Sequence, residues 1–109
     1  MAKVFGMHPF ALKYGVAPED FERFVKEAVP HLPELAGVKL YILKGDRGDR
    51  EGKYLMLIET ESVKMRNRYW PQPGALSDEA NKLLAALGTW GHLVMGPGSP
   101  ISTDYVVVE

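Results

Sequence analysis

The fold of this chain is decided by two apolar runs that flank a charged, glycine-rich turn. Residues 38–44 are Val-Lys-Leu-Tyr-Ile-Leu-Lys, residues 45–52 are Gly-Asp-Arg-Gly-Asp-Arg-Glu-Gly, and residues 53–60 are Lys-Tyr-Leu-Met-Leu-Ile-Glu-Thr. Branched aliphatic and aromatic side chains favour extended backbone, whereas glycine and charged residues favour a solvent-exposed turn. We therefore predict a β-hairpin with strands over 38–44 and 53–60.

A strand and a helix are predicted before this hairpin. Residues 3–12 are rich in Val, Phe, Met and Leu and are followed by the turn-like sequence Lys13-Tyr14-Gly15, which is typical of a strand and its end. Pro18 suits the first turn of a helix, and apolar residues recur after it at helical spacing. The sequence therefore predicts a helix over 18–29.

Two helices, a loop and a last strand are predicted after the hairpin. Ser62 and Ser77 are of the residue type that caps helix N-termini, and we expect the first helix to reach residue 70 and the second to reach Gly88. Residues 89–100 contain three glycines and two prolines and predict a loop. Residues 104–108 predict the final strand.

This order of elements predicts an α+β fold. Strand, helix, strand, strand, helix, strand is the ferredoxin-like βαββαβ plan, with a four-stranded antiparallel sheet and the helices on one face. A length of 109 residues, 46% hydrophobic and 25% charged, fits one domain over 1–109.

Both faces of the predicted sheet are apolar. In the first strand of the hairpin, Leu40 and Ile42 face one side while Tyr41 and Leu43 face the other. An antiparallel sheet with one solvated face should instead alternate apolar and polar side chains. The helices suffice for one face, and covering several hundred Å² of the other is worth on the order of 10 kcal/mol before the costs of association. A second copy of the same sheet is the simplest cover, so we expect a homodimer.

The chain resembles the dimeric α+β barrel superfamily, in which two ferredoxin-like subunits pack sheet to sheet. The resemblance rests on the segments 3–8, 37–43, 54–62 and 105–108. The superfamily includes cofactor-independent monooxygenases of the antibiotic-biosynthesis type, haem-degrading monooxygenases, muconolactone-isomerase-like proteins and EthD-like proteins. The resemblance implies a pocket in each subunit, between the sheet and the helices or near the end of the barrel, lined by aromatic residues. It does not select among these activities, because one fold hosts many functions.

One departure from the family bears on cofactors. Haem-degrading members carry an Asn on the first strand and a haem-ligating His on a helix. Here the first strand carries His8, and the helical region 62–88 contains no histidine. The haem site therefore does not transfer to this chain, and we expect no cofactor.

Charge and composition restrict the partners. Lys and Arg total 13 against 14 Asp and Glu, so a formal net charge of -1 gives no reason to expect a nucleic acid or a membrane surface as partner. The chain has no cysteine, and no run approaches the roughly 20 apolar residues of a membrane span. We expect a cytoplasmic protein.

His8 is the main candidate for catalysis. An imidazole works as an acid or a base near neutral pH, and His8 lies in an otherwise apolar strand. Two other interpretations are open. His8 is a core histidine satisfied by a backbone carbonyl, or it lies where the strand is bulged or ends early at Pro9, a residue that is unfavourable in a central strand.

Arg66, Tyr69, Trp70 and Trp90 are the candidates for ligand binding. Arg66 and Trp70 are four residues apart on a predicted helix, so they share a face and are suited to hold an anionic planar molecule by charge and stacking. Tyr69 lies beside them, and Trp90 lies in a glycine-bounded stretch that is suited to close a pocket. The alternative is that these aromatic side chains only pack in the core or anchor the loop.

The sequence offers no metal site, and it leaves two functions open. His8, His31 and His92 are far apart, lack the spacing of metal ligands and have no cysteine partner. One function is a small-molecule-binding homodimer that acts as a cofactor-independent monooxygenase or isomerase on an apolar or aromatic compound, with His8 as proton acceptor. The other is a non-catalytic dimer that binds a ligand or a protein partner.

Overall fold

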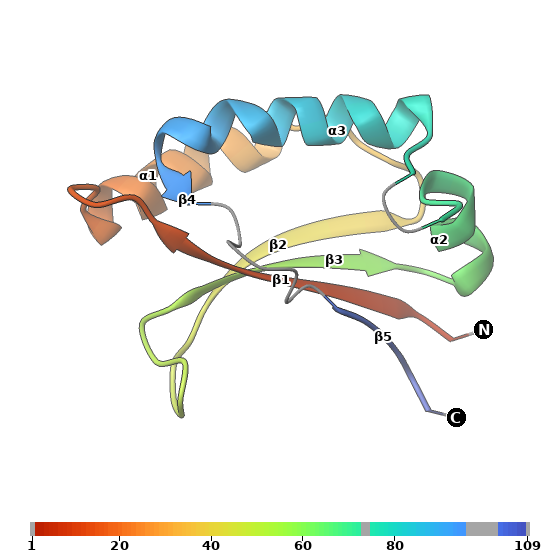
Figure 1. The fold of residues 1–109 in the computed structure, drawn as a ribbon, viewed down its shortest axis with the longest axis horizontal. Helices are drawn as coiled ribbons and strands as arrows, with labels where there is room; N and C mark the ends of the chain where they lie inside the picture. Colours follow the sequence, from red (N-terminus) through yellow and green to blue (C-terminus); the bar gives the residue numbers. More distant parts are fainter. Residues whose placement is uncertain (1, 73–74, 96–102, 109) are drawn as a thin grey trace.

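The computed structural model describes residues 2–72, 75–95 and 103–108, and shows an antiparallel sheet with helices on one side (Figure 1). The strands are β1 (Val4–Leu12), β2 (Val38–Lys44), β3 (Tyr54–Thr60), β4 (Val94–Met95) and β5 (Thr103–Val106). The helices are α1 (Pro18–Ala28), α2 (Val63–Tyr69) and α3 (Asp78–Gly88), with 3-10 turns η1 (Val29–His31) and η2 (Thr89–His92).

The sheet has the strand order of a ferredoxin-like fold. The order is β2-β3-β1, and β4 and β5 both lie on the far side of β1, with every pairing antiparallel. Along the chain, helix α1 connects β1 to β2, and helices α2 and α3 connect β3 to β4. The predicted α+β class and βαββαβ order are confirmed, with the second helix divided into two and the fourth strand position filled by two short strands.

The helices begin where the sequence predicts. The Ser62 hydroxyl accepts a hydrogen bond from the Met65 backbone N–H at 3.1 Å, and the Ser77 hydroxyl accepts one from Ala80 at the same distance. Each cap satisfies one of the amide groups that a helix start leaves without a partner. These local signals therefore fix the starts of α2 and α3.

The stretch predicted as a loop over 89–100 differs from the structure in its first half. Residues 89–92 form η2, and β4 follows and pairs with Ala11 and Leu12. Trp90 is buried and packs edge-on against Phe24, with ring centroids 5.3 Å apart. This contact between distant parts of the chain holds residues 89–92 in place, although Gly91 lies among them. Residues 96–100 of the predicted loop lie outside the described residues.

Strand β1 continues through Pro9 without a bulge. Its register with β3 is unbroken from Val4 opposite Thr60 to Phe10 opposite Tyr54. On its other side, β5 pairs with residues 4–7 and β4 with residues 11–12, so Pro9 lies between the two described pairing segments. Proline has no backbone N–H group to donate to a neighbouring strand, and this loss costs the sheet least at a position between two pairing segments. The interpretation that the strand ends early or bulges at Pro9 is therefore wrong.

The core lies between the sheet and the helices. Phe21 of α1 is fully buried and packs edge-on against Phe10 and Tyr54, at centroid distances of 5.8 and 5.1 Å. A second cluster joins α2 and α3 to the loop before β2 and contains Leu35, Tyr69, Ala80 and Leu83. Both clusters face the same side of the sheet, where α1 and α3 lie in Figure 1.

The opposite face of the sheet is largely apolar and has no cover among the described residues (Figure 1). Residues paired across an antiparallel sheet share a face, so the register places one set of side chains here. Its apolar members are Phe5, Met7, Pro9, Tyr41, Leu43, Leu55, Leu57 and Tyr105, and the same register places the polar residues Lys39, Glu59 and Thr103 on this face. Tyr41, Leu43 and Tyr105 are 38%, 41% and 52% exposed. The second apolar face that the sequence predicts is therefore present over most of the sheet, and charged residues interrupt it at the Lys39–Glu59 pair.

Within the described ranges, every helix falls short of the length and apolarity needed to cross a bilayer.

Candidate functional site

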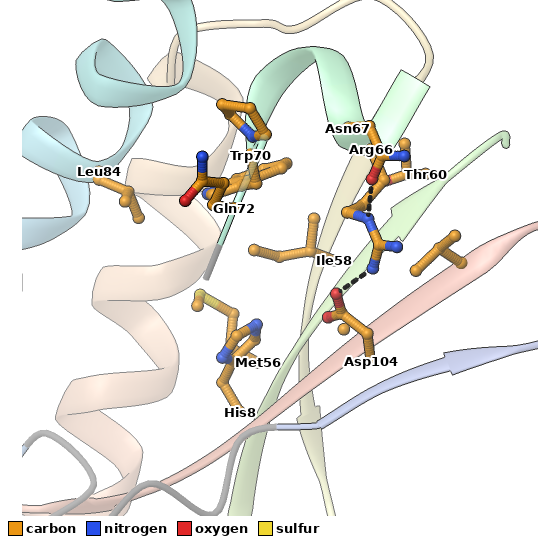
Figure 2. Close-up of a pocket in the computed structure, with 13 residues that line it drawn as sticks. His8, Met56, Ile58, Thr60, Arg66, Asn67, Trp70, Gln72, Leu84 and Asp104 are labelled. Carbon is orange, nitrogen blue, oxygen red and sulfur yellow. Dashed lines mark hydrogen bonds and ion pairs between the residues drawn. The ribbon is translucent and has the colours of Figure 1, made fainter. Parts of the chain in front are cut away.

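A cavity of about 760 Å³ lies between the helix-facing side of the sheet and helices α2 and α3 (Figure 2). This volume falls within the range of roughly 300–1,000 Å³ that is usual for small-molecule sites. Apolar side chains from three elements line it, among them Val4 of β1, Met56 and Ile58 of β3, and Leu84 of α3. A few polar groups converge on the same space, which is the pattern of a ligand pocket.

The floor of the cavity is built by strand periodicity. Every second residue of a strand faces the same side, so Val4, Gly6 and His8 face the cavity together. The register places Met56 directly opposite His8 and Ile58 opposite Gly6, which extends the floor onto β3. Figure 2 shows the His8 ring beside the Met56 side chain.

One wall of the cavity is built by helix periodicity. Arg66 and Trp70 are separated by one turn at the end of α2, and both line the cavity together with Asn67. Trp70 presents a large flat side chain, and Arg66 presents a cation. This pairing on one face is the one that the sequence predicts.

An ion pair crosses the cavity wall between α2 and β5. The Arg66 Nη1 atom donates to Asp104 Oδ2 at 2.6 Å, and Arg66 Nε donates to the Asn67 side-chain oxygen at 2.9 Å (Figure 2). Both Arg66 and Asp104 are partly exposed. Two acceptors on different sides of one planar guanidinium fix its orientation at the cavity.

His8 is half-buried on the cavity floor, and its surroundings act on its charge. Burial lowers the pKa of His8 from its ordinary value of 6.5, because desolvation disfavours the charged ring, and the Asp104 carboxylate partly opposes this shift. The imidazole is therefore mainly uncharged at neutral pH. An uncharged imidazole in a cavity is suited to accept a proton.

The structure brings together three of the five residues singled out in the sequence and places two elsewhere. His8, Arg66 and Trp70 line the cavity. Tyr69 is fully buried in the core, where its hydroxyl donates to the Ala36 carbonyl oxygen at 2.9 Å. Trp90 is buried beside Phe24, away from the residues that line the cavity. Tyr69 is the last residue of α2 and Trp70 is its C-cap with non-helical backbone, so the two side chains point in different directions.

Asp104 is the main cavity residue that the sequence interpretation missed. It lies on β5, whose presence the sequence predicts, and it pairs with Gly6 of β1. A ferredoxin-like order places the last strand beside the first, so the sequence can predict that the strand of Asp104 lies next to β1. The sequence does not predict which residue of β1 pairs with Asp104, because no local signal in either strand specifies the register.

The cavity also bears on metal binding. In the ranges 2–72, 75–95 and 103–108, no group of three or more metal-ligating side chains is placed to hold a metal ion. His8 and Asp104 line the same cavity. Two such groups alone fall short of a protein metal centre, which needs three or four ligands.

Comparisons with known proteins give one structural likeness. No protein-family model and no curated protein matches this chain. Among solved structures, SnoaB, described as a cofactor-independent oxygenase from Streptomyces nogalater, is similar with a TM-score of 0.46 and 16% sequence identity, and the match covers 100% of this chain and 94% of that chain. A likeness of this extent assigns neither an activity nor a site to this chain.

Proposed function

We propose that the cavity binds a small, largely apolar or aromatic molecule and that His8 removes a proton from it. The observation that supports this proposal is the position of His8, whose largely uncharged ring lines a cavity of about 760 Å³. A histidine kept only for packing would instead be enclosed in the core. The proposal makes His8 the catalytic residue.

The walls of the cavity support an apolar or aromatic ligand. Val4, Met56, Ile58 and Leu84 offer apolar contact, and Trp70 offers a flat surface. Aromatic rings gain from stacking on such a surface in addition to the area that they bury. Arg66 lies on the same wall and offers a positive charge to an oxygen that becomes negative when the proton leaves.

Two reactions can follow from proton removal, and both use the same residues. In an isomerisation, His8 returns the proton to a different atom of the ligand. In a monooxygenation, the carbanion gives its electrons to O2, so that a CH2 group becomes C=O and the second oxygen atom leaves as water. In each reaction His8 holds the proton while the negative charge is on the ligand.

We also propose that two copies of the chain pack through the uncovered face of the sheet. That face presents Tyr41, Leu43 and Tyr105 to solvent. Apolar patches of this kind on small domains usually mark interaction sites. A two-fold axis lets the same patch cover itself, which produces the dimeric barrel. The cavity lies on the opposite face, so each copy would hold its own ligand.

Proton removal can be tested without knowledge of the natural substrate. 2-Tetralone is a small bicyclic ketone with exchangeable protons beside its carbonyl group, and NMR in D2O follows their replacement by deuterium. We expect the protein to accelerate this exchange, and His8→Gln to lower the acceleration by about 10²-fold or more, as is usual for loss of a general base. His31→Ala is the matched control, because His31 is exposed and lies away from the cavity.

The outcome separates the two functions. If 2-tetralone binds in calorimetry while exchange in the wild-type protein is no faster than in buffer, His8 is not a proton acceptor and the non-catalytic binding function is favoured. If the His8→Gln variant exchanges as fast as the wild type, the base lies elsewhere. Loss of exchange in the His31→Ala variant as well would show that the effect is not specific to the cavity.

A further inference from the structure

Asp104 and Arg66 carry the only charged side chains among the described residues that line the cavity. We infer that Asp104 sets the charge selectivity of this cavity: by balancing Arg66, it favours uncharged ligands that carry an ionisable hydroxyl or an enolisable carbonyl over ligands with a permanent negative charge, such as carboxylates. This inference rests on the proposed function, because it requires the cavity to bind a ligand.

The contacts of Arg66 show that its charge is already paired. Asp104 Oδ2 accepts from Nη1 at 2.6 Å, a short distance typical of a charge-assisted hydrogen bond. The Asn67 oxygen accepts from Nε at 2.9 Å. A carboxylate on a ligand would therefore compete with Asp104 for the guanidinium, and would lose hydration on entering a partly apolar cavity.

The strand register holds Asp104 on the cavity side of the sheet. Asp104 pairs with Gly6, and Gly6 and His8 face the cavity from the same strand. One point beside Gly6, where a Cβ atom would lie, is 3.0 Å from Asp104 Oδ1 and 3.2 Å from His8 Nε2. The carboxylate and the imidazole thus face the same small space, and a ligand that reaches His8 also comes near Asp104.

The charge balance of the proposed reaction agrees with this selectivity. The charges of Arg66 and Asp104 sum to zero. Burial keeps the His8 ring mainly uncharged, because it lowers the pKa of the imidazole. A phenol or an enolisable ketone enters without charge. When it gives its proton to His8, the negative charge on the ligand oxygen and the positive charge on the ring appear together, so the net charge in the cavity does not change. A carboxylate would add one uncompensated negative charge from the start.

The test compares two ligands of nearly equal shape. 2-Naphthol is uncharged at neutral pH, and 2-naphthoate carries one negative charge. Isothermal titration calorimetry measures both affinities for the wild type and for Asp104→Asn, which keeps the shape of the side chain and removes its charge. Asp49→Asn is the matched control, since it makes the same change of charge at the exposed tip of the hairpin.

We expect the wild type to bind 2-naphthol more tightly than 2-naphthoate. Asp104→Asn should shift the ratio of the two affinities toward 2-naphthoate by at least about tenfold, which corresponds to about 1.4 kcal/mol, and Asp49→Asn should leave the ratio unchanged. Arg66→Gln provides a second variant with the opposite expectation: Asp104 then lacks its partner, and the ratio should move further toward 2-naphthol.

Three outcomes would overturn the inference. If both probes bind and Asp104→Asn and Arg66→Gln leave their ratio unchanged, Asp104 does not set selectivity, although the cavity remains a ligand site. If the wild type prefers 2-naphthoate, the guanidinium is open to anions and the inference is wrong. If neither probe binds the wild type, the proposed binding function fails together with it. Circular dichroism of each variant identifies a change that arises from unfolding.

Discussion

Gly6 and Asp104 lie opposite each other on β1 and β5, and a methyl group on Gly6 would lie 3.0 Å from Asp104 Oδ1 and 3.2 Å from His8 Nε2. Both distances are shorter than ordinary van der Waals contact, so the two side chains would have to move. Glycine at this position therefore lets the carboxylate and the imidazole share one side of the cavity floor.

We predict that Gly6→Ala disturbs the cavity. Displacement of His8 and Asp104 should slow 2-tetralone exchange by about tenfold, because small misplacements of a catalytic group are costly, and overpacking should lower the free energy of unfolding by about 1 kcal/mol. Exchange NMR and urea unfolding measure these effects.

Gly88→Ala is the control for this prediction. Gly88 has φ -60 and open space around its Cβ position, so alanine should stabilise the protein by about 0.5 kcal/mol. Normal exchange in Gly6→Ala would show that the contact is not critical.

The burial of His8 predicts how stability depends on pH. Its pKa in the folded protein is below the ordinary 6.5, so the unfolded chain takes up a proton first as the pH falls. The stability that comes from the uncharged ring is present above about pH 6.5 and is lost as the pH falls through the folded pKa. As the pH falls below about 6.5, the urea midpoint of unfolding should therefore fall more for the wild type than for His8→Gln. A constant difference between pH 5 and pH 8 would show that burial does not shift the pKa of His8.

Tyr54 predicts a second pH dependence at the other end of the sheet. Its hydroxyl donates to Glu22 Oε2 at 2.6 Å, Lys44 donates to the same oxygen at 2.9 Å, and burial together with this hydrogen bond raises the pKa of Tyr54 to about 12. The unfolded chain loses this proton first, so the contribution to stability is present below pH 10 and is lost between about pH 10 and pH 12. Absorbance titration should show a late-ionising component, and Tyr54→Phe should remove the contribution of Tyr54 to it and lower the melting temperature.

Tyr14→Phe is the control for this experiment. Tyr14 is fully exposed, so its removal should leave the late ionisation and the melting temperature unchanged. Retention of the late ionisation in Tyr54→Phe would assign it to another tyrosine.

The features that the sequence predicted are those with local causes. Ser62 and Ser77 cap helices through contacts three residues away, and Arg66 and Trp70 share a face because they are one helical turn apart. Each signal lies within a few residues of the structure that it specifies. The hairpin over 38–60 is local in the same sense, since its turn and its two strands are contiguous.

The features that the sequence did not predict depend on contacts between distant segments. Asp104 reaches the cavity through a pairing with Gly6, almost the whole chain away, and a register of this kind has no local signal. Trp90 is held by Phe24, which turns a glycine-containing stretch into η2. Tyr69 and Trp70 are adjacent aromatic residues, and the tertiary packing of α2 decides which of the two faces the cavity.

The uncovered face of the sheet gives the last prediction. Light scattering should find a particle of about twice 12.1 kDa, and Leu43→Glu should raise the dissociation constant by about a hundredfold or more, because an uncompensated charge buried in an interface costs several kcal/mol. Leu76→Glu is the control, since Leu76 is similarly exposed but lies outside the sheet. A monomeric wild type, or a dimer that tolerates Leu43→Glu, would contradict the sheet-to-sheet packing. Because the described lining residues of the cavity lie on the opposite face of a single chain, the Leu43→Glu monomer should still bind 2-naphthol, which separates assembly from ligand binding.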